Sequence, residues 1–263
     1  MLGRYLKLAE TSFKEMLAYR TNFIGGLAQS VLTLIAFWFL WKAIFTTAGT
    51  PEINGMTFEI MITYMVISSL IRPLAWSFVE GEIEYDVRMG GITRKLTIPM
   101  SYPLYRLFGN IGAVGYKVMT WGFPVLLGAV LIVKVSMPAS LLFFVSLIFS
   151  YLINFLLAFL TGMWVFWSGG KVWGLTLSRN MISDMVSGSL MPLYFFPAWL
   201  FSILQLLPFA AAFHIPLSIY IGKISGVEIF SALGFQVLWI LILSAFVGFV
   251  WSRAKKRIFS QGG

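Results

Sequence analysis

The side chains best suited to chemistry lie in one charged stretch, about a third of the way along the chain. Four carboxylates fall in a single short run, and basic residues follow them. The members are Glu80, Glu82, Glu84, Asp86, Arg88, Arg94, Lys95 and Arg106. So many charges between two long apolar segments are expected to meet water. The stretch is therefore predicted to be a surface, either a docking site for another protein or a solvated connector.

Catalysis by the chain itself has little support. No nucleophile with a general base and no pair of carboxylates placed for acid–base work is recognisable. The nearest approach to a phosphate loop is Gly169-Gly170-Lys171, but Val165 and Val172 stand where that motif needs a glycine and a hydroxyl. We therefore predict a non-catalytic chain with no ATPase, cofactor or metal site of its own.

Three further charged residues fall inside apolar segments. Arg72 and Lys117 lie close enough to a membrane surface for their long side chains to snorkel to the headgroups, which is the favoured interpretation. The alternative is that both face the interior of a helix bundle. Asp184 could pair with either of them, and the sequence leaves this open.

The composition places the rest of the chain in a membrane. Of the 263 residues, 59% are hydrophobic and 11% are charged, whereas a soluble domain carries about 25% charged residues. Only helices and closed barrels can span hydrocarbon, and the long continuous apolar runs favour helices. The net charge of +9 is assigned to loops on one side of the membrane rather than to nucleic-acid binding. The chain lacks cysteine, which excludes disulfides and thiolate metal sites.

The apolar runs predict an all-α protein with one membrane domain over residues 23–252. An amphipathic helix over residues 1–22 precedes it in the interface plane, and a basic tail over residues 253–263 follows. Each predicted span supplies the roughly 20 apolar residues that a bilayer core needs. The six spans are Phe23–Phe45, Phe58–Val79, Ile111–Val133, Pro138–Val165, Leu177–Leu200 and Phe230–Trp251.

The positions of Lys and Arg predict the orientation. Most of the 19 basic residues fall in the N-terminal segment, the 80–110 loop, the loop after the fourth span and the tail. In a six-span protein these segments lie on the same side, which the positive-inside rule assigns to the cytoplasm. We therefore expect a multi-pass protein of the cytoplasmic (inner) membrane with both termini inside the cell.

A second distinctive stretch runs from Ser187 to Pro216, where prolines interrupt a long apolar segment. Proline removes a backbone donor and breaks a helix, which lipid tolerates only where protein or a cavity covers the break. The pattern predicts a fifth span that ends early, then short helices re-entering the outer leaflet before the sixth span. Two ordinary kinks are the alternative.

Together the two stretches resemble the permease subunits of type-2 ABC exporters, a class that includes drug, polysaccharide and lipid exporters. That family has a Gly-Glu-Ile-Glu segment after the second span, here Gly81 to Glu84, which leads to a Leu-x-x-Pro, here Leu96 to Pro99. Its second signature is a proline-spaced run of small residues that ends in Pro-Phe and a later proline. Here that run reads Gly188, Pro192, Pro197, Pro208-Phe209 and Pro216.

The resemblance covers nearly the whole chain. The opening KEMLAYRTNFIGG and the later FWFLWKAIF are similar to one subgroup with poorly defined substrates, in which two different permeases are commonly paired. One departure is Asp86-Val87, where family members often have Gly-Thr. The exact turn of the charged segment therefore remains open, although its location does not.

The resemblance implies a coupling helix between the second and third spans. Residues 80–99, with Glu80, Ile83, Asp86 and Arg88 among them, would dock into a groove on a separate ATPase, helped by the N-terminal helix. It also implies two ATPase subunits, which bind the ATP and Mg, and a second permease, identical or different. Membrane lipid would surround the complex, and motion of the ATPases would open a path between the permeases.

The sequence is thus interpreted as the membrane-spanning subunit of an ATP-driven exporter. One alternative is a permease for polysaccharide or lipid-linked glycan, which would need a continuous aromatic-lined groove. Another is a channel or ion-coupled carrier that works without an ATPase, which predicts paired ionisable residues near mid-membrane. The sparse charge within the predicted spans argues against this last alternative.

Overall fold

A computed structural model describes residues 2–18, 21–75, 78–128, 130 and 138–261. In this part of the chain the protein is all-helical apart from a two-stranded antiparallel β-hairpin, β1 (Glu52–Ile53) with β2 (Met56–Thr57). The helices are α1 (Leu2–Ala18), α2 (Thr21–Ala48), α3 (Phe58–Ala75), α4 (Val79–Arg88), α5 (Gly91–Thr97), α6 (Tyr102–Lys117), the π-helix η1 (Val118–Gly122), α7 (Phe123–Gly128), α8 (Leu142–Met163), α9 (Val165–Ser168), α10 (Trp173–Val186), the 3-10 helix η3 (Leu193–Phe195), α11 (Ala198–Leu204), α12 (Pro208–Tyr220) and α13 (Glu228–Gln261).

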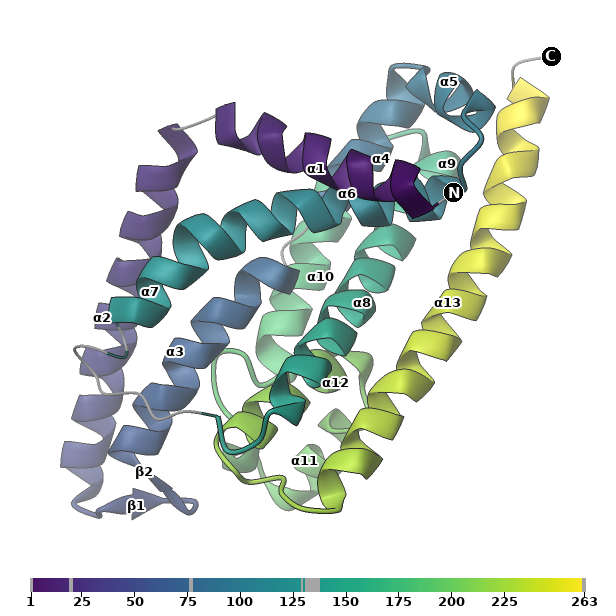
Figure 1. Ribbon diagram of the computed structural model, residues 1–263. Helices are drawn as coiled ribbons and strands as arrows, with labels where there is room; N and C mark the ends of the chain where they lie inside the picture. The colour runs from purple at the N-terminus through teal and green to yellow at the C-terminus, as the bar shows by residue number, and fades with distance from the viewer. Residues whose placement is uncertain (1, 19–20, 76–77, 129, 131–137, 262–263) are drawn as a thin grey trace.

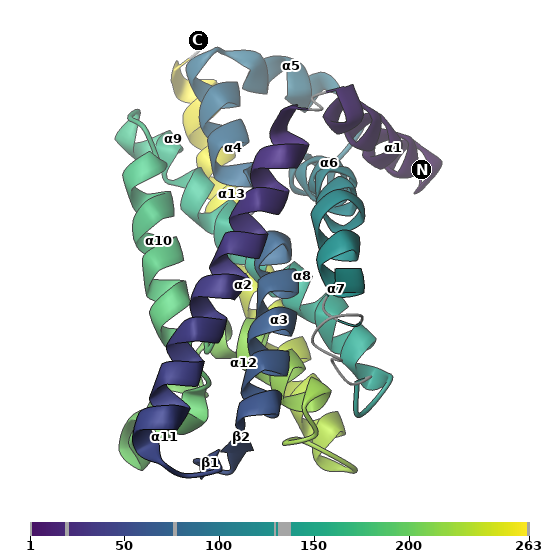
Figure 2. The ribbon, with the colours of Figure 1, turned by 90° about the vertical axis from the view of Figure 1, so that its left-hand side faces the viewer.

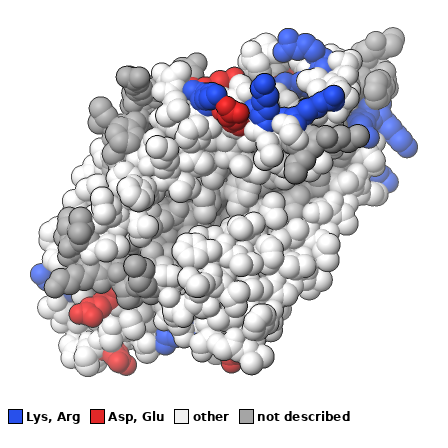
Figure 3. Space-filling model, viewed as in Figure 1, with Lys and Arg blue, Asp and Glu red and all other residues white. Residues whose placement is uncertain are grey.

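The long helices stand side by side between two polar ends (Figure 1). One end holds α1, α4, α5 and the C-terminal part of α13, and Lys and Arg gather there (Figure 3). We call it the basic end. The opposite end, which we call the β end, holds β1, β2 and α11 (Figure 2).

In the described part of the chain, four helical stretches are long and apolar enough to cross a membrane, and the bent pair α11–α12 would make a fifth. The four are Val31–Ala48, Phe58–Arg88, Leu142–Ser168 and Glu228–Arg257. This architecture agrees with the predicted all-α membrane protein, whereas the six-span layout is not confirmed. The predicted third span corresponds to α6, η1 and α7, and the final part of that prediction, residues 129 and 131–133, lies outside the described residues.

The predicted fifth span, Leu177–Leu200, is wrong in its extent. Its helix, α10, begins four residues earlier and ends at Val186. With 14 residues it is about 21 Å long, shorter than the roughly 30 Å of a bilayer core. The chain then turns through Gly188, whose φ is +86°.

Proline explains the short helices that follow α10. Pro192 and Pro197 each stand immediately before a helix, and Pro208 is the first residue of α12, where its missing N–H costs no intrahelical bond. Pro216 lies inside α12. The axes of α11 and α12 differ by 107°, so a sharp break replaces the long helix that an uninterrupted apolar run would form.

The amphipathic helix α1 lies across α6 at the basic end (Figures 1 and 2). The crossing is close because Gly112 has no side chain. A Cβ there would collide with the carbonyl oxygen of Ala9 and lie 2.9 Å from the Cβ of Ser12. Aromatic pairs flank the crossing, with Tyr5 and Phe108 rings 5.0 Å apart between centroids.

A buried polar cluster fixes the packing of α8, α12 and α13. The side-chain amide of Gln236 donates to the Ala211 carbonyl at 2.8 Å and to the Ser150 hydroxyl at 3.2 Å. Its oxygen accepts a hydrogen bond from the Ser146 hydroxyl at 2.9 Å. The three helices are thus held by bonds whose partners are all internal, as an apolar surrounding requires.

Candidate functional site

The charged stretch folds into two short helices that project at the basic end (Figure 1). Helix α4 and helix α5 meet at Gly90 and form what we call the α4–α5 unit. Of the predicted coupling residues, Leu96 lies in α5 and Pro99 lies just beyond it. The predicted loop ended at residue 110, whereas α6 already begins at Tyr102, so residues 102–110 are helical.

Two of the four carboxylates do not meet water, contrary to the expectation from the sequence. Glu80 is 1% exposed and Asp86 is 2% exposed. The Asp86 carboxylate accepts hydrogen bonds from the Lys95 ammonium at 2.6 Å and the Tyr102 hydroxyl at 2.7 Å, and it pairs with Arg106. Burial is tolerated because these donors replace the water that the carboxylate loses.

Arg106 ties the α4–α5 unit to α6. Its guanidinium donates to the Glu82 carboxylate at 2.6 Å and to the Glu82 carbonyl at 2.9 Å, and its Nε donates to the Tyr102 hydroxyl at 3.2 Å. The Tyr102 ring stacks on Trp251 of α13 with centroids 5.0 Å apart. Burial raises the pKa of the Tyr102 phenol well above its ordinary value, so this hydroxyl stays protonated and keeps its hydrogen bond to Asp86.

Helix α4 also packs directly on α8. A Cβ at Gly162 of α8 would lie 2.8 Å from the Cδ1 of Ile83 and 2.9 Å from the Cα of Glu80. Glycine is therefore required for this approach. Ile83 is fully buried there with Val79 and Phe159.

On its other side α4 contacts α10, and we call this contact the α4–α10 seam. The Glu84 carboxylate accepts a hydrogen bond at 3.0 Å from the backbone N–H of Val172, the residue before α10. Its second oxygen lies 3.0 Å from the Arg88 guanidinium. Further along, the Glu80 carboxylate lies 2.6 Å from the guanidinium of Arg179. Nothing in the sequence around Arg179 indicates a partner 99 residues away.

A cavity of about 570 Å³ lies beside the seam, between α2, α3, α4 and α10. Figure 2 faces the side where α2, α3 and α10 stand together. The wall of the cavity is formed by apolar, hydroxyl and charged side chains. They include Thr33, Phe37, Met65, Ser68, Arg72, Phe78, Glu80, Glu84, Lys117, Trp173, Thr176, Leu177 and Asn180.

Arg72, Lys117 and Asp184, the three charged residues predicted to lie within the membrane, are all found at or next to this cavity. The Arg72 guanidinium donates to the Asp184 carboxylate at 2.7 Å, so of the two partners considered for Asp184 the structure selects Arg72. Lys117 is 7% exposed, and its ammonium lies 4.7 Å from the centroid of the Phe78 ring. The favoured prediction that both side chains snorkel outward is therefore wrong, because each finds an internal partner.

The second predicted motif lies away from the α4–α5 unit, toward the β end. Gly188 and Ser189 follow α10 and bind α3, since the Tyr64 hydroxyl donates to the Gly188 carbonyl at 2.7 Å and the Ser68 hydroxyl to the Ser189 carbonyl at 2.5 Å. Pro192 and Pro216 are buried, whereas Pro197 is exposed and Pro208 and Phe209 are half-buried. The motif therefore shapes the far end of α10 and the α11–α12 break.

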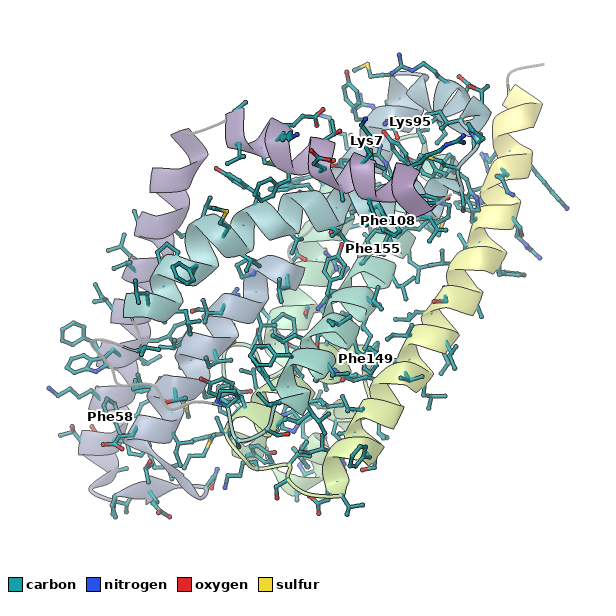
Figure 4. The ribbon with its side chains drawn as sticks, in the orientation of Figure 1. Lys7, Phe58, Lys95, Phe108, Phe149 and Phe155 are labelled. Atoms are coloured by element: carbon teal, nitrogen blue, oxygen red, sulfur yellow. The ribbon has the colours of Figure 1, made fainter. Side chains whose placement is uncertain are left out.

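The outer face of the α4–α5 unit presents apolar and basic side chains to solvent. Tyr85 is 65% exposed and Met89 is 67% exposed, and Arg88 and Arg94 are exposed next to them. Lys95 of α5 lies at the same end as Lys7 of α1 (Figure 4). A rigid projection with an exposed apolar tip is suited to docking rather than to catalysis.

Comparison with known proteins agrees with this geometry. A family model described as ABC-2 family transporter protein matches residues 31–262, which takes in the α4–α5 unit, the seam and the cavity. No curated protein matches the sequence. Permeases of this family are generally non-catalytic membrane subunits that associate with an ABC ATPase. The chain belongs to the ABC-2 family and is a membrane permease of an ABC transporter.

Proposed function

We propose that the chain is an exporter permease that forms a translocation path with a second permease and is driven by two ABC ATPase subunits. The ATPases would bind the ATP and Mg²⁺, and this chain would supply the path. The observation that carries the proposal is the α4–α5 unit next to the cavity. We call its exposed residues Tyr85, Arg88 and Met89 the tip, and its buried, charge-paired part around Asp86 the base.

The tip has the properties of a docking element. Tyr85 and Met89 offer apolar surface of the kind enriched at the centre of interfaces, and Arg88 adds charge at the edge. The base is held by Asp86, Arg106 and their partners, so a force applied at the tip would move the unit as one body.

A second permease would complete the cavity. None of the residues of α10 is buried, and its large side chains Trp173, Met181 and Met185 are exposed. Helix α2 exposes Leu32 and Phe39 in the same way. Because α2 and α10 border the cavity, a partner packed on them would cover both the apolar surface and the open side, with lipid around the remainder.

The basic end would face the cytoplasm. The positive-inside rule assigns the side rich in Lys and Arg to the cytoplasm (Figure 3), and both α1 and the end of α13 lie on that side (Figure 1). In this orientation, with the protein in the inner membrane of the cell, the tip of the α4–α5 unit would be within reach of a soluble ATPase.

One observation favours a second candidate, an ion-coupled carrier. The Arg72–Asp184 pair joins α3 to α10, and Arg72 lines the cavity between these helices. An ionisable pair beside a path through the membrane is what the carrier alternative predicts. An ATPase bound to the chain would decide against it.

Co-purification tests the proposal. The tagged full-length protein is extracted in mild detergent, in its native form and with Tyr85→Glu and Met89→Glu together. We expect an ABC ATPase and a second membrane protein with the native chain, and loss of the ATPase from the variant. Val227→Glu is the matched control, because Val227 is 85% exposed and lies before α13 at the β end. A native chain that purifies without any ATPase would overturn the proposal in favour of the carrier.

A further inference from the structure

We propose that α10 is the moving wall of the cavity, and that Glu84 and Glu80 transmit the motion of the α4–α5 unit to it. This inference rests on the proposed function and names the residues through which ATPase motion reaches the path. In these terms Glu84 and Glu80 are positioning residues, since they act on the cavity through α10.

Helix α10 lies at the surface of this chain. None of its 14 residues is buried, although the helix lies between α4 and the loop that leads to η3. Helix α8, by contrast, buries side chains along its whole length. Helix α10 contacts α8 and α12 as well, and its ion pairs join it to α4 through Glu80 and to α3 through Arg72.

The contacts at the basic end join α10 to α4 at two points. Glu80 and Glu84 are four residues apart and therefore share one face of α4. Their partners are the backbone N–H of Val172, which immediately precedes α10, and the guanidinium of Arg179, seven residues further along. Two attachments transmit rotation as well as translation, whereas a single attachment would act as a swivel.

The contacts at the other end join α10 to α3 instead. The Arg72–Asp184 pair spans 2.7 Å, and the Ser189 hydroxyl donates to the second oxygen of Asp184 at 3.1 Å. The Tyr64 and Ser68 hydroxyls of α3 donate hydrogen bonds to the carbonyls of Gly188 and Ser189, shortly after the end of α10. Helix α10 is thus anchored to α3 at one end and attached to α4 at the other, the arrangement of a lever with a fixed far end.

The seam also retains polar atoms that this closed arrangement does not satisfy. Among the described residues, both carboxylate oxygens of Glu80, the hydroxyl of Thr176 and the Nε of Arg179 are buried without a hydrogen-bond partner, so Glu80 and Arg179 are joined by their charges alone. Thr176 lies on α10 between Val172 and Arg179, and it lines the cavity together with Glu80. Water that enters the cavity can reach Glu80 and Thr176, which both line it.

The test uses the complex with its ATPases in lipid nanodiscs and a single introduced cysteine. The chain has no cysteine of its own, so Leu177→Cys on the cavity wall of α10 is labelled by a maleimide without background. We expect the labelling rate to differ by about fivefold or more between the nucleotide-free and the ATP–vanadate-trapped complex, the lower range of coupling between two sites.

Removing the attachments should abolish this response. In Glu84→Met, which keeps the shape but removes the acceptor, we expect the labelling ratio to fall below about twofold. Glu84→Gln retains an acceptor for the Val172 N–H and should restore most of the response. A second variant, Glu80→Met with Arg179→Met, removes both charges together and so leaves no unpaired buried charge. Glu228→Met, exposed at the β end, is the matched control.

Docking is followed separately through Met89→Cys, which a bound ATPase should shield from the maleimide. A purely structural role would change this shielding, whereas the lever predicts that the shielding stays at its native value. A native labelling ratio at Leu177→Cys in both attachment variants, or no nucleotide response of that site in an otherwise native complex that hydrolyses ATP, overturns the inference alone. Absence of any bound ATPase overturns the proposed function instead.

Discussion

Arg106 and Asp86 form a buried ion pair across 20 residues of sequence, with side chains 8% and 3% exposed. The pair joins α6 to α4, and it lets a charged segment fold against an apolar core. Arg106 also binds Glu82, so one guanidinium holds two of the four carboxylates of the charged stretch.

Breaking this pair from one side should be costly. Arg106→Met leaves Asp86 buried with only Lys95 and Tyr102, and loss of one partner of a buried pair costs about 3–5 kcal/mol. We expect a clearly lower midpoint of thermal unfolding for the purified protein in detergent. Arg253→Met serves as the control, because Arg253 is exposed on α13, and this variant should unfold like the native chain. An unchanged midpoint for Arg106→Met would show that Arg106 does not hold the α4–α5 unit.

The Tyr102 hydroxyl should make stability depend on alkaline pH. The pKa of this phenol is raised by burial in the folded protein, whereas in the unfolded chain it is near 10. The folded state therefore holds the proton more tightly, and its stability is fully present below pH about 10 and declines as the pH rises beyond that value. Urea unfolding at several pH values should show this decline for the native chain and a weaker one for Tyr102→Phe. Equal slopes would exclude a special environment for Tyr102.

Gly112 should tolerate no larger residue. Gly112→Leu would drive a side chain into the backbone of α1 at Ala9, and overpacking typically costs about 1–3 kcal/mol. We expect α1 to detach, so that a protease cleaves between α1 and α2 faster than in the native protein. Gly248→Leu on α13 meets nothing within 4 Å and should leave the cleavage rate unchanged. Equal cleavage of both variants would contradict the close crossing.

The Gln236 cluster should stabilise the bundle independently of the α4–α5 unit. Gln236→Leu leaves the Ser146 and Ser150 hydroxyls and the Ala211 carbonyl without this partner, at about 1–3 kcal/mol for an unsatisfied buried group. We expect a lower unfolding midpoint with unchanged ATPase binding. Gln205→Leu, at an exposed position, is the control. Loss of ATPase binding in Gln236→Leu would show that the two regions are not separable.

Part of this structure follows from local sequence. Helices α2, α8 and α13 coincide with continuous apolar runs, and hydropathy alone locates such runs. The breaks around Pro192 and Pro208 are equally local, because proline acts within its own helix turn.

The site is less predictable because its partners are distant in sequence. Glu80 looks like a surface residue until Arg179 is placed beside it, and Arg72 looks like a snorkelling residue until Asp184 is placed beside it. The early end of α10 is similar, since Gly188 and Ser189 are held by side chains of α3. Composition reports how much charge a segment carries, and only tertiary structure reports where that charge is neutralised.

The close approach at Gly162 also fixes the length of the segment that crosses it. Deleting one residue between Gly81 and Tyr85 would turn the following part of α4 by about 100° and swing Ile83 or Asp86 away from its partners. Chimeras that borrow this segment from another permease should therefore keep the spacing of Glu80, Ile83 and Asp86, while the exposed Tyr85 and Met89 can be exchanged to match a different ATPase. The spacing of the buried residues on the inner face of α4 must be kept in such a chimera, whereas the exposed residues on its outer face can vary.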